Sequence, residues 1–380
     1  MSILKVDTIT KADGTGSLSV PAESGTVVTT ASPSLGRRNL IINGAMQVAQ
    51  RGTSVTGAAN QALCLDRFRF NANRDQAVVD LSQATDAPTG FKYSKKITIT
   101  TAETTVDAGN YIQTEYALEG NDISHLAYGT SNAKTLTLSF WVKSSSTGVF
   151  PVTLSNSGGN YHYPSSYTID TANAWEYKTI TISGATAGAW TTTGSSEGFK
   201  FRFGLTYGST YNGATANQWL SSASFSNAFV TATNNVMTTT NATWQITGVQ
   251  LEVGSVATPF EHRSFGEELA LCKRYYEQFG NGWTVRGETT NISCVLFGGF
   301  AVEKRSSPSI GTTTSNVRMY EWGVANRDAA TVSINSNVMK KWGGHVKLSG
   351  WSTIGTGIIY GMSYNTTTDD GEPFYADSEL

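Results

Sequence analysis

The sequence predicts a mainly β protein, built as an antiparallel β-sandwich followed by a short helix and a second, smaller β-sandwich domain. Charged residues make up 15% of the chain and aromatic residues 11%, and glycine contributes 38 of the 380 residues. Threonine and aromatic side chains suit the half-buried surface of a sheet. About ten short strand-like segments precede residue 264, separated by Gly-, Ser- and Asn-rich turns with few helical windows between them. This spacing is typical of antiparallel sandwiches rather than of βαβ units.

Residues 1–38 differ from the rest of the chain. They open on a strand-like segment whose apolar positions are Ile3, Val6 and Ile9, and turn residues such as Pro21 interrupt the remainder of this region. Short strands broken by turns cannot close a hydrophobic core alone. We therefore expect residues 1–38 to attach the chain to other copies of itself or to another protein, with these three apolar residues as contacts.

Residues 39–264 are expected to form the first sandwich. In the clearest strand, residues 134–143, one face carries Leu136, Leu138, Phe140 and Val142. Residues 39–44 are predicted to be a buried strand that closes in a turn. The other expected strands are residues 65–70, 78–81, 96–100, 111–116, 152–154, 175–182, 199–205 and 243–251.

Residues 265–380 are expected to begin with a helical neck and to end in a β-rich knob. The helix is predicted over residues 266–279, with acidic residues in its first turn and glycines beyond its end. A 3-4-3 spacing forms an apolar seam, which packs either on its own domain or against other copies of the chain. Its members are Leu269, Cys272, Tyr276 and Phe279. Residues 283–380 contain six or seven strand candidates.

Composition excludes several classes of protein. A net charge of −2 leaves no basic surface for nucleic acid. No apolar run reaches the roughly 18 residues of a membrane-spanning helix, and no basic segment precedes an apolar one near the start, as in a secretory signal. The three scattered cysteines fit free thiols in a chain made in a reducing cytoplasm.

The motifs of common enzyme classes are missing, so we expect a protein that is not an enzyme and has no cofactor. The sequence contains no phosphate-binding loop, zinc-protease helix or serine nucleophile elbow, and none of the four histidines has a metal-ligand companion. Residues 369–372 are acidic but lack the alternation of a calcium loop. We interpret them as a solvated turn, while a structural calcium ion in the sandwich stays open.

The aromatic residues are the remaining signal. Sugars stack their C–H faces on aromatic rings, with Asn, Asp and Gln side chains nearby to bind hydroxyls. Two aromatic loops and the dense tryptophans of the distal region fit this chemistry, although packing in a core or between subunits is the alternative. The glycan-binding candidates are Tyr161, Tyr163, Tyr207, Tyr211, Trp219, Trp322, Trp342 and Trp351.

The two ends of the sandwich region carry sequence motifs of a known family. Residues 38–54 and 65–68 resemble the opening of a bacteriophage tail-fibre or minor structural protein family. Residues 249–263 and 267–276 resemble the close of that family. The segments between these motifs are similar to a carbohydrate-binding-module jelly roll, and the first residues are similar to the virion-anchoring start of such fibres.

This resemblance implies a phage virion protein, synthesised in the host bacterial cytoplasm and assembled as a homotrimeric tail fibre or spike. It implies attachment to another tail, collar or head protein through residues 1–38. It also implies recognition of host surface polysaccharide or lipopolysaccharide without cleavage. Two alternatives remain, a purely structural head fibre, collar or connector, and a tailspike that depolymerises polysaccharide.

Overall fold

The computed structural model describes residues 9–10, 17–18, 37–222, 225–226, 228–279, 284–287, 293–312, 317–321, 325–329, 333–349, 359–364 and 374–380. The chain divides into two compact units, residues 1–38 and 39–380. In the first unit β1 (Ile9–Thr10) pairs antiparallel with β2 (Ser17–Leu18), which places Ile9 opposite Leu18. Ile3 and Val6 lie outside the described residues, so their role as contacts stays a prediction.

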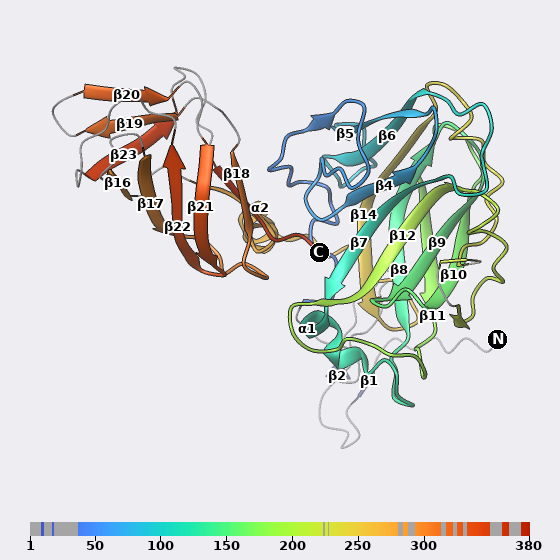
Figure 1. The fold of residues 1–380 in the computed structure, drawn as a ribbon. Coiled ribbons are helices and arrows are strands. Elements are labelled where there is room, and N and C mark those ends of the chain that lie inside the picture. Colours follow the sequence, from blue (N-terminus) through green and yellow to red (C-terminus); the bar gives the residue numbers. More distant parts are fainter. Residues whose placement is uncertain are drawn as a thin grey trace. The chain divides into compact units, whose positions relative to one another are not determined.

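Two six-stranded antiparallel sheets dominate the second unit (Figure 1). One sheet has the order β13-β10-β9-β12-β7-β4 and the other has the order β11-β8-β14-β6-β5-β3. The first sheet consists of β4 (Arg69–Asn73), β7 (Tyr111–Glu119), β9 (Gly148–Asn156), β10 (Tyr161–Ile169), β12 (Glu197–Tyr207) and β13 (Leu220–Ser221). The second sheet consists of β3 (Ser54–Val55), β5 (Val78–Ala84), β6 (Ser94–Thr101), β8 (Leu136–Ser144), β11 (Glu176–Ile182) and β14 (Thr243–Val253). The helices α1 (Gly120–Ile123) and η1 (Ser124–Leu126) follow β7.

The core of the sandwich lies between these sheets. The four apolar residues predicted to share one face of β8 are all fully buried. Across the core, the Phe140 ring of β8 meets the rings of Tyr167 and Phe203 from the other sheet edge-on, at centroid distances of 5.0 and 5.2 Å. Alternate residues of each strand therefore fill the core, and the predicted mainly β, antiparallel sandwich fold is confirmed.

Residues 39–44 do not form the expected strand. They run as irregular backbone beside β14, with Asn43 in the left-handed region at φ 62°. Backbone hydrogen bonds join the segment to β14 at its two ends, from the Leu40 N–H to the Leu251 carbonyl and from the Val249 N–H to the Gly44 carbonyl, both at 2.9 Å. Between them the Asn39 side chain intervenes, because its amide donates to the Val249 carbonyl at 3.1 Å and its oxygen accepts from the Leu251 N–H at 3.0 Å. Ile41 and Ile42 are buried without a continuous strand ladder.

The predicted helix over residues 266–279 is wrong in its second half. Helix α2 spans Phe265–Lys273, and its first turn is capped by the Ser264 side chain, which accepts from the Glu267 N–H. Residues Tyr276–Phe279 form β15 instead, because β24 (Phe374–Asp377) supplies a strand partner for them. A partner about 100 residues distant in sequence is invisible to a local helical pattern.

The predicted apolar seam is consequently not one face of a helix. Leu269 and Cys272 lie on α2, whereas Tyr276 and Phe279 lie on β15. Cys272, Tyr276 and Phe279 are buried within a single chain, and Cys272 packs with Ile42 of the sandwich unit. These three side chains are therefore occupied by contacts inside the chain.

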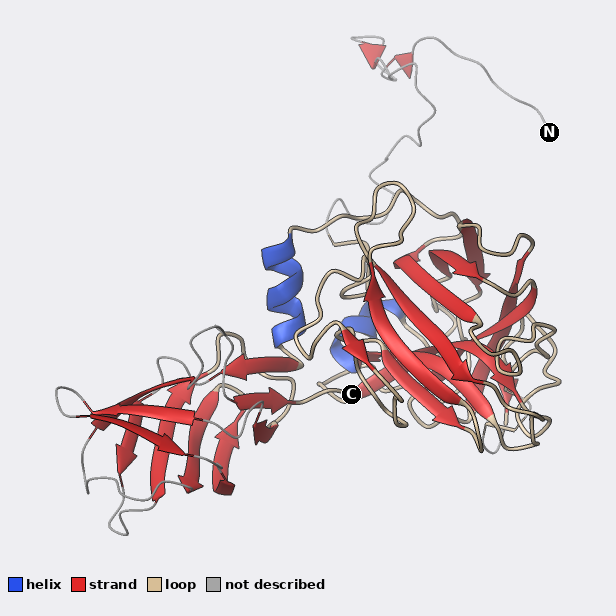
Figure 2. Cartoon of the chain, turned by 90° about the horizontal axis from the view of Figure 1, so that it is seen from above, coloured by secondary structure: helices blue, strands red, loops and turns tan. Residues whose placement is uncertain are grey.

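The remaining strands form two further antiparallel sheets, and strands outnumber helices throughout the described residues (Figure 2). A three-stranded sheet has the order β15-β24-β18, with β18 at Ser309–Thr312. A seven-stranded sheet has the order β20-β19-β23-β16-β17-β22-β21. Its strands are β16 (Thr284–Gly287), β17 (Ser293–Gly299), β19 (Val317–Glu321), β20 (Ala325–Ala329), β21 (Ser333–Lys340), β22 (Gly343–Ser349) and β23 (Ile359–Tyr364).

Several ion pairs cross the predicted boundary between residues 264 and 265. Arg274 binds both carboxylate oxygens of Glu119 at 2.7 and 2.8 Å, and Arg51 contacts Asp377 at 3.2 Å. Arg67 pairs with Glu379, next to the Arg51 contact. Residues 39–380 accordingly form one compact unit.

Two of the cysteines, Cys64 and Cys272, are buried free thiols. Burial raises the pKa of the Cys64 thiol and raises that of Cys272 well above its usual value.

Candidate functional site

A groove of about 390 Å³ opens on the outer face of the first sandwich sheet. It arises from the alternation of the strands, since Ile112 and Thr114 of β7 point into the core while Gln113 and Glu115 point outward. Adjacent strands add outward residues in register. The groove residues from strands are Arg69 and Asn71 of β4, Tyr111, Gln113 and Glu115 of β7, and Lys200, Arg202 and Tyr207 of β12. Asn60, Tyr211, Phe225 and Phe229 from loops complete what we call the tyrosine groove.

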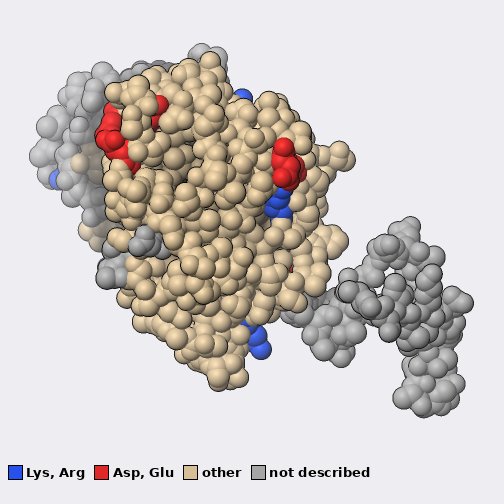
Figure 3. All heavy atoms as spheres, turned by 90° about the vertical axis from the view of Figure 1, so that its right-hand side faces the viewer, with Lys and Arg blue, Asp and Glu red and all other residues tan. Residues whose placement is uncertain are grey.

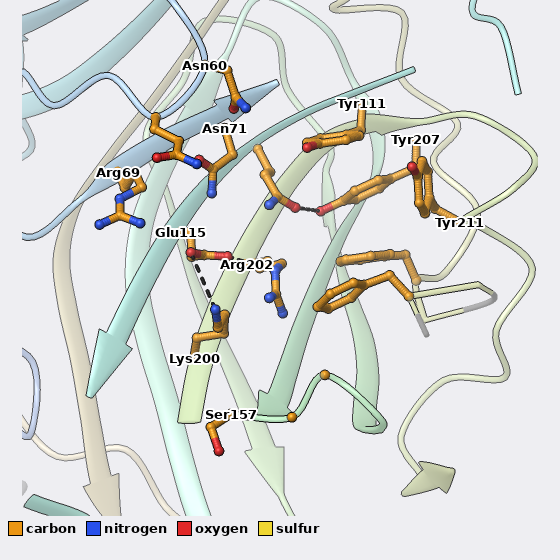
Figure 4. Close-up of a pocket in the computed structure, with 16 residues that line it drawn as sticks. Asn60, Arg69, Asn71, Tyr111, Glu115, Ser157, Lys200, Arg202, Tyr207 and Tyr211 are labelled. Atoms are coloured by element: carbon orange, nitrogen blue, oxygen red, sulfur yellow. Dashed lines mark hydrogen bonds and ion pairs between the residues drawn. The ribbon is translucent and has the colours of Figure 1, made fainter. Parts of the chain in front are cut away.

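A charged cluster forms the floor of the groove. Glu115 lies opposite both Arg69 and Arg202 in the strand register. Its carboxylate binds the Arg202 Nε at 2.9 Å, with the Lys200 ammonium at 3.8 Å (Figure 4). The Arg202 side chain is only 4% exposed, and its guanidinium lies 4.2 Å from the centre of the Phe225 ring. These contacts fix the positions of the groups without consuming every N–H donor of the guanidinium.

Tyrosine rings gather on the other side of the groove, as Figure 4 shows for Tyr111, Tyr207 and Tyr211. The Tyr207 ring stacks on Phe229 at 3.8 Å between centroids, and its hydroxyl donates to the Gln113 side chain at 2.6 Å. Burial raises the pKa of Tyr207 well above its usual value, so this hydroxyl stays a donor. The Tyr111 and Tyr211 rings are half-buried and meet edge-on at 5.5 Å.

The structure brings Tyr207 and Tyr211 of the sequence candidates into this groove and places Tyr161, Tyr163 and Trp219 elsewhere. The Trp219 ring stacks on Tyr161 at 5.3 Å and meets Tyr163 at 5.2 Å, and its indole N–H donates to the Ser183 carbonyl at 2.8 Å. Tyr163 is buried, whereas Tyr161 and Trp219 pack against the main core. These three rings form a second aromatic cluster, in which Tyr161 and Trp219 are half-buried, and their glycan binding stays a prediction.

The distal candidates are separate from both groups. Trp342 lies in the turn between β21 and β22 and is 68% exposed. Trp322 and Trp351 lie outside the described residues.

Sequence reasoning does not single out the polar floor of the groove. A signal for it exists, because residues 199–203 alternate phenylalanine with Lys200 and Arg202, and Gln113 and Glu115 stand at alternate positions of another strand-like segment. The polar positions of one strand become a site only when the pairing of β7 with β12 and β4 is known.

Among the residues that the structure describes, no group of three or more His, Cys, Asp or Glu side chains lies close enough together to hold a metal ion. The structural calcium ion left open by the sequence stays an open prediction. The nine-residue α2 is the longest helix described, and about 20 residues are needed to cross a bilayer. Figure 3 shows one face of the molecule, on which isolated charged side chains stand among neutral ones.

Neither a protein-family model nor a curated protein matches the chain. Among solved structures, the enzymatically active domain of bacteriophage CBA120 tailspike protein 4 is 11% identical with a TM-score of 0.31, covering 57% of this chain and 21% of that one. A carbohydrate-binding module, CBM4, is 14% identical with a TM-score of 0.29, covering 56% and 98%. A family 11 module of a Clostridium thermocellum cellulase is 12% identical with a TM-score of 0.28, covering 55% and 98%. At such low scores these similarities carry no weight for function.

Proposed function

We propose that this protein is a phage fibre or spike component whose sandwich binds a host surface glycan in the tyrosine groove without cleaving it. The observation that carries the proposal is that tyrosine rings and hydrogen-bonding side chains line the same groove on one sheet face. The half-buried rings of Tyr111 and Tyr211 offer surfaces to the C–H faces of a sugar. Gln113, Asn71 and Arg202 lie within the same groove to bind its hydroxyls.

The size and rigidity of the groove support binding of a short oligosaccharide. Its volume of about 390 Å³ falls in the range of small-molecule sites. The floor is held by the Glu115–Arg202 ion pair and by the hydrogen bond from Tyr207 to Gln113. Side chains fixed before binding reduce the entropy that is lost on association.

The number of carboxylates that line the groove favours binding of a glycan over its hydrolysis. Glycosidases use two carboxyl groups on either side of the scissile bond, from about 5 to 9.5 Å apart. Among the described residues that line the groove, Glu115 is the sole carboxylate, and it is engaged by Arg202 and Lys200. A groove with this composition lacks the second carboxylate for acid–base chemistry.

The virion location and the trimer are further parts of the proposal, and both rest on the sequence motifs of residues 38–54 and 249–276. A chain made in the host cytoplasm would attach to the virion through residues 1–38. Three copies of one weak site acting on the same cell surface would bind far more tightly than a single copy. Light scattering tests the trimer directly, and a monomer at all concentrations would contradict it.

Binding to host cells tests the glycan site. We expect Tyr211→Ala to weaken binding of the full chain about tenfold, because one stacking ring is lost. Trp342→Ala is the matched control, since it removes an exposed aromatic ring far along the sequence. Equal binding by both variants and the unaltered protein would refute the tyrosine groove as the site, and loss with Trp342→Ala alone would move it to the distal region.

The two alternatives give different results in the same assays. A purely structural head fibre, collar or connector would not compete with phage for host cells. A depolymerase would release reducing sugar from host polysaccharide, and Glu115→Gln would abolish the release. We expect competition for cells and no release of sugar.

A further inference from the structure

A second groove, of about 550 Å³, lies on the outer face of the other sandwich sheet. Three parts of the chain line it, namely the outward faces of β8, β11 and β14, the loop at residues 89–91, and the segment at residues 257–262. It shares no lining residue with the tyrosine groove.

One side of this groove is a strip of aromatic rings on two paired strands. Trp141 of β8 stands directly opposite Tyr177 of β11, with ring centroids 5.3 Å apart, and Tyr177 is 45% exposed. Trp175, just before β11 and two residues before Tyr177, is half-buried and lies beyond the residues that line the groove, and its indole N–H donates to Asp86 at 3.1 Å. We call Trp141, Trp175 and Tyr177 the aromatic platform.

The opposite side of the groove is also aromatic. The Phe91 ring meets Phe260 at 5.0 Å and His262 at 5.4 Å between centroids. Between the two sides, Gly248 sits in a β-bulge of β14 at φ 62°. A Cβ at Gly248 would lie 2.7 Å from the Phe91 ring and 3.1 Å from Trp141, so the glycine makes room for these two rings to approach the strand. Bulges of this kind often lie beside functional sites.

The residue types that line the second groove indicate which class of ligand it binds. None of the described lining residues is Asp, Glu, Lys or Arg, which favours an uncharged partner. The apolar residues of the groove are mainly aromatic rings, whose flat faces match the C–H faces of sugar rings. Partly exposed rings beside the hydroxyl-bearing Thr89 and Thr258 suit the alternating apolar and hydroxyl surfaces of a pyranose.

We infer that the outer face of β8 and β11 is a second glycan-binding site, specific for an uncharged oligosaccharide whose sugar rings stack on the aromatic platform. The Asp86–Lys143 ion pair at 2.7 Å lies at its Trp175 end, where it offers hydrogen bonds without net charge. The second site shares no lining residue with the tyrosine groove, so the inference does not depend on whether the tyrosine groove binds a glycan.

The test uses the full chain and neutral hexasaccharides of glucose, galactose, mannose or xylose, measured by titration calorimetry and tryptophan fluorescence. We expect at least one to bind, Trp141→Ala and Tyr177→Ala each to weaken that binding about tenfold or more, and Trp141→Phe to retain most of it. Trp342→Ala controls for loss of an exposed tryptophan and should leave the affinity unchanged. Thermal unfolding confirms that each variant is folded.

Three results would overturn the inference. In the first, none of the hexasaccharides binds. In the second, one binds but Trp141→Ala and Tyr177→Ala leave its affinity unchanged. In the third, these variants reduce the oligomeric state of the protein without altering affinity for sugar, which would make the platform a contact between copies. Loss of host-polysaccharide binding with Tyr211→Ala tests the first groove separately.

Discussion

Lys95 makes the stability of the sandwich depend on pH. Its side chain is fully buried in β6, where the ammonium donates to the Phe68 carbonyl at 2.7 Å. Burial lowers the pKa of Lys95 to about 7 from 10.5, because the charged form loses its hydration. The unfolded chain therefore binds this proton more tightly than the folded chain does.

The sign and size of the effect follow from proton linkage. Stability falls as the pH drops from 10.5 to about 7, and the cost is constant below that range. The full shift corresponds to about 5 kcal/mol of unfolding free energy, of which about 2.5 kcal/mol develops between about pH 9 and pH 6. Lys95→Met removes the titration and loses one hydrogen bond, worth about 1 kcal/mol. We expect the variant to be more stable than the unaltered protein near pH 6 by about 3–4 kcal/mol.

Denaturant unfolding of both proteins between about pH 6 and pH 9 measures this difference. Lys96→Met, at the next and half-buried position of β6, is the matched control and should follow the pH dependence of the unaltered protein. The reasoning is refuted if the Lys95→Met and unaltered curves stay parallel across the range, or if the variant is less stable near pH 6.

Three further predictions concern the same unit. Arg274→Met should lower the unfolding free energy by about 2–3 kcal/mol, because it strands the buried Glu119 carboxylate; burial raises the pKa of Glu119, but the hydrogen bonds from Arg274 and Tyr275 and the charges of Arg274 and Arg67 together outweigh it and hold the pKa below its usual range, so this contribution is lost in acid and the variant's deficit should shrink there. Gly248→Ala should cost about 1–2 kcal/mol, since φ is 62° and the new methyl meets Phe91, and thermal unfolding would show no loss if that geometry were wrong. Phe140→Ala should cost about 3–5 kcal/mol by leaving a cavity between the sheets, and a loss below about 1 kcal/mol in denaturant unfolding would contradict the central place of this ring.

Much of the sandwich can be predicted from local pattern, and its exceptions have identifiable causes. The alternation in β8 assigns Leu136 and Phe140 to the core because a strand buried on one face needs a period of two. The same reasoning fails at residues 39–44, where Ile41 and Ile42 are buried but the Asn39 side chain takes over part of the hydrogen bonding that a strand would make to β14. Local pattern also fails at residues 276–279, where the distant β24 decides the structure.

The candidate sites show the same limit. Sequence reasoning selects Tyr207 and Tyr211 because aromatic loops are visible in a single segment. It does not select Glu115 and Arg202, whose meeting depends on the register between β7 and β12. It also does not show that Tyr207 and Tyr211 lie in one groove while Trp219 stacks on Tyr161 in a separate cluster, since both groups are aromatic loop residues in the sequence.

The burial of Cys64 and Cys272 makes these thiols reporters of opening of the fold. A thiol must be ionised and reachable before alkylating or oxidising reagents can modify it, and burial works against both conditions here. Cys64 belongs to the main core of the sandwich, whereas Cys272 belongs to the small cluster that joins α2 to Ile42. The labelling rate of Cys64 therefore measures how often the two sheets separate. The labelling rate of Cys272 measures how often helix α2 is released from the sandwich.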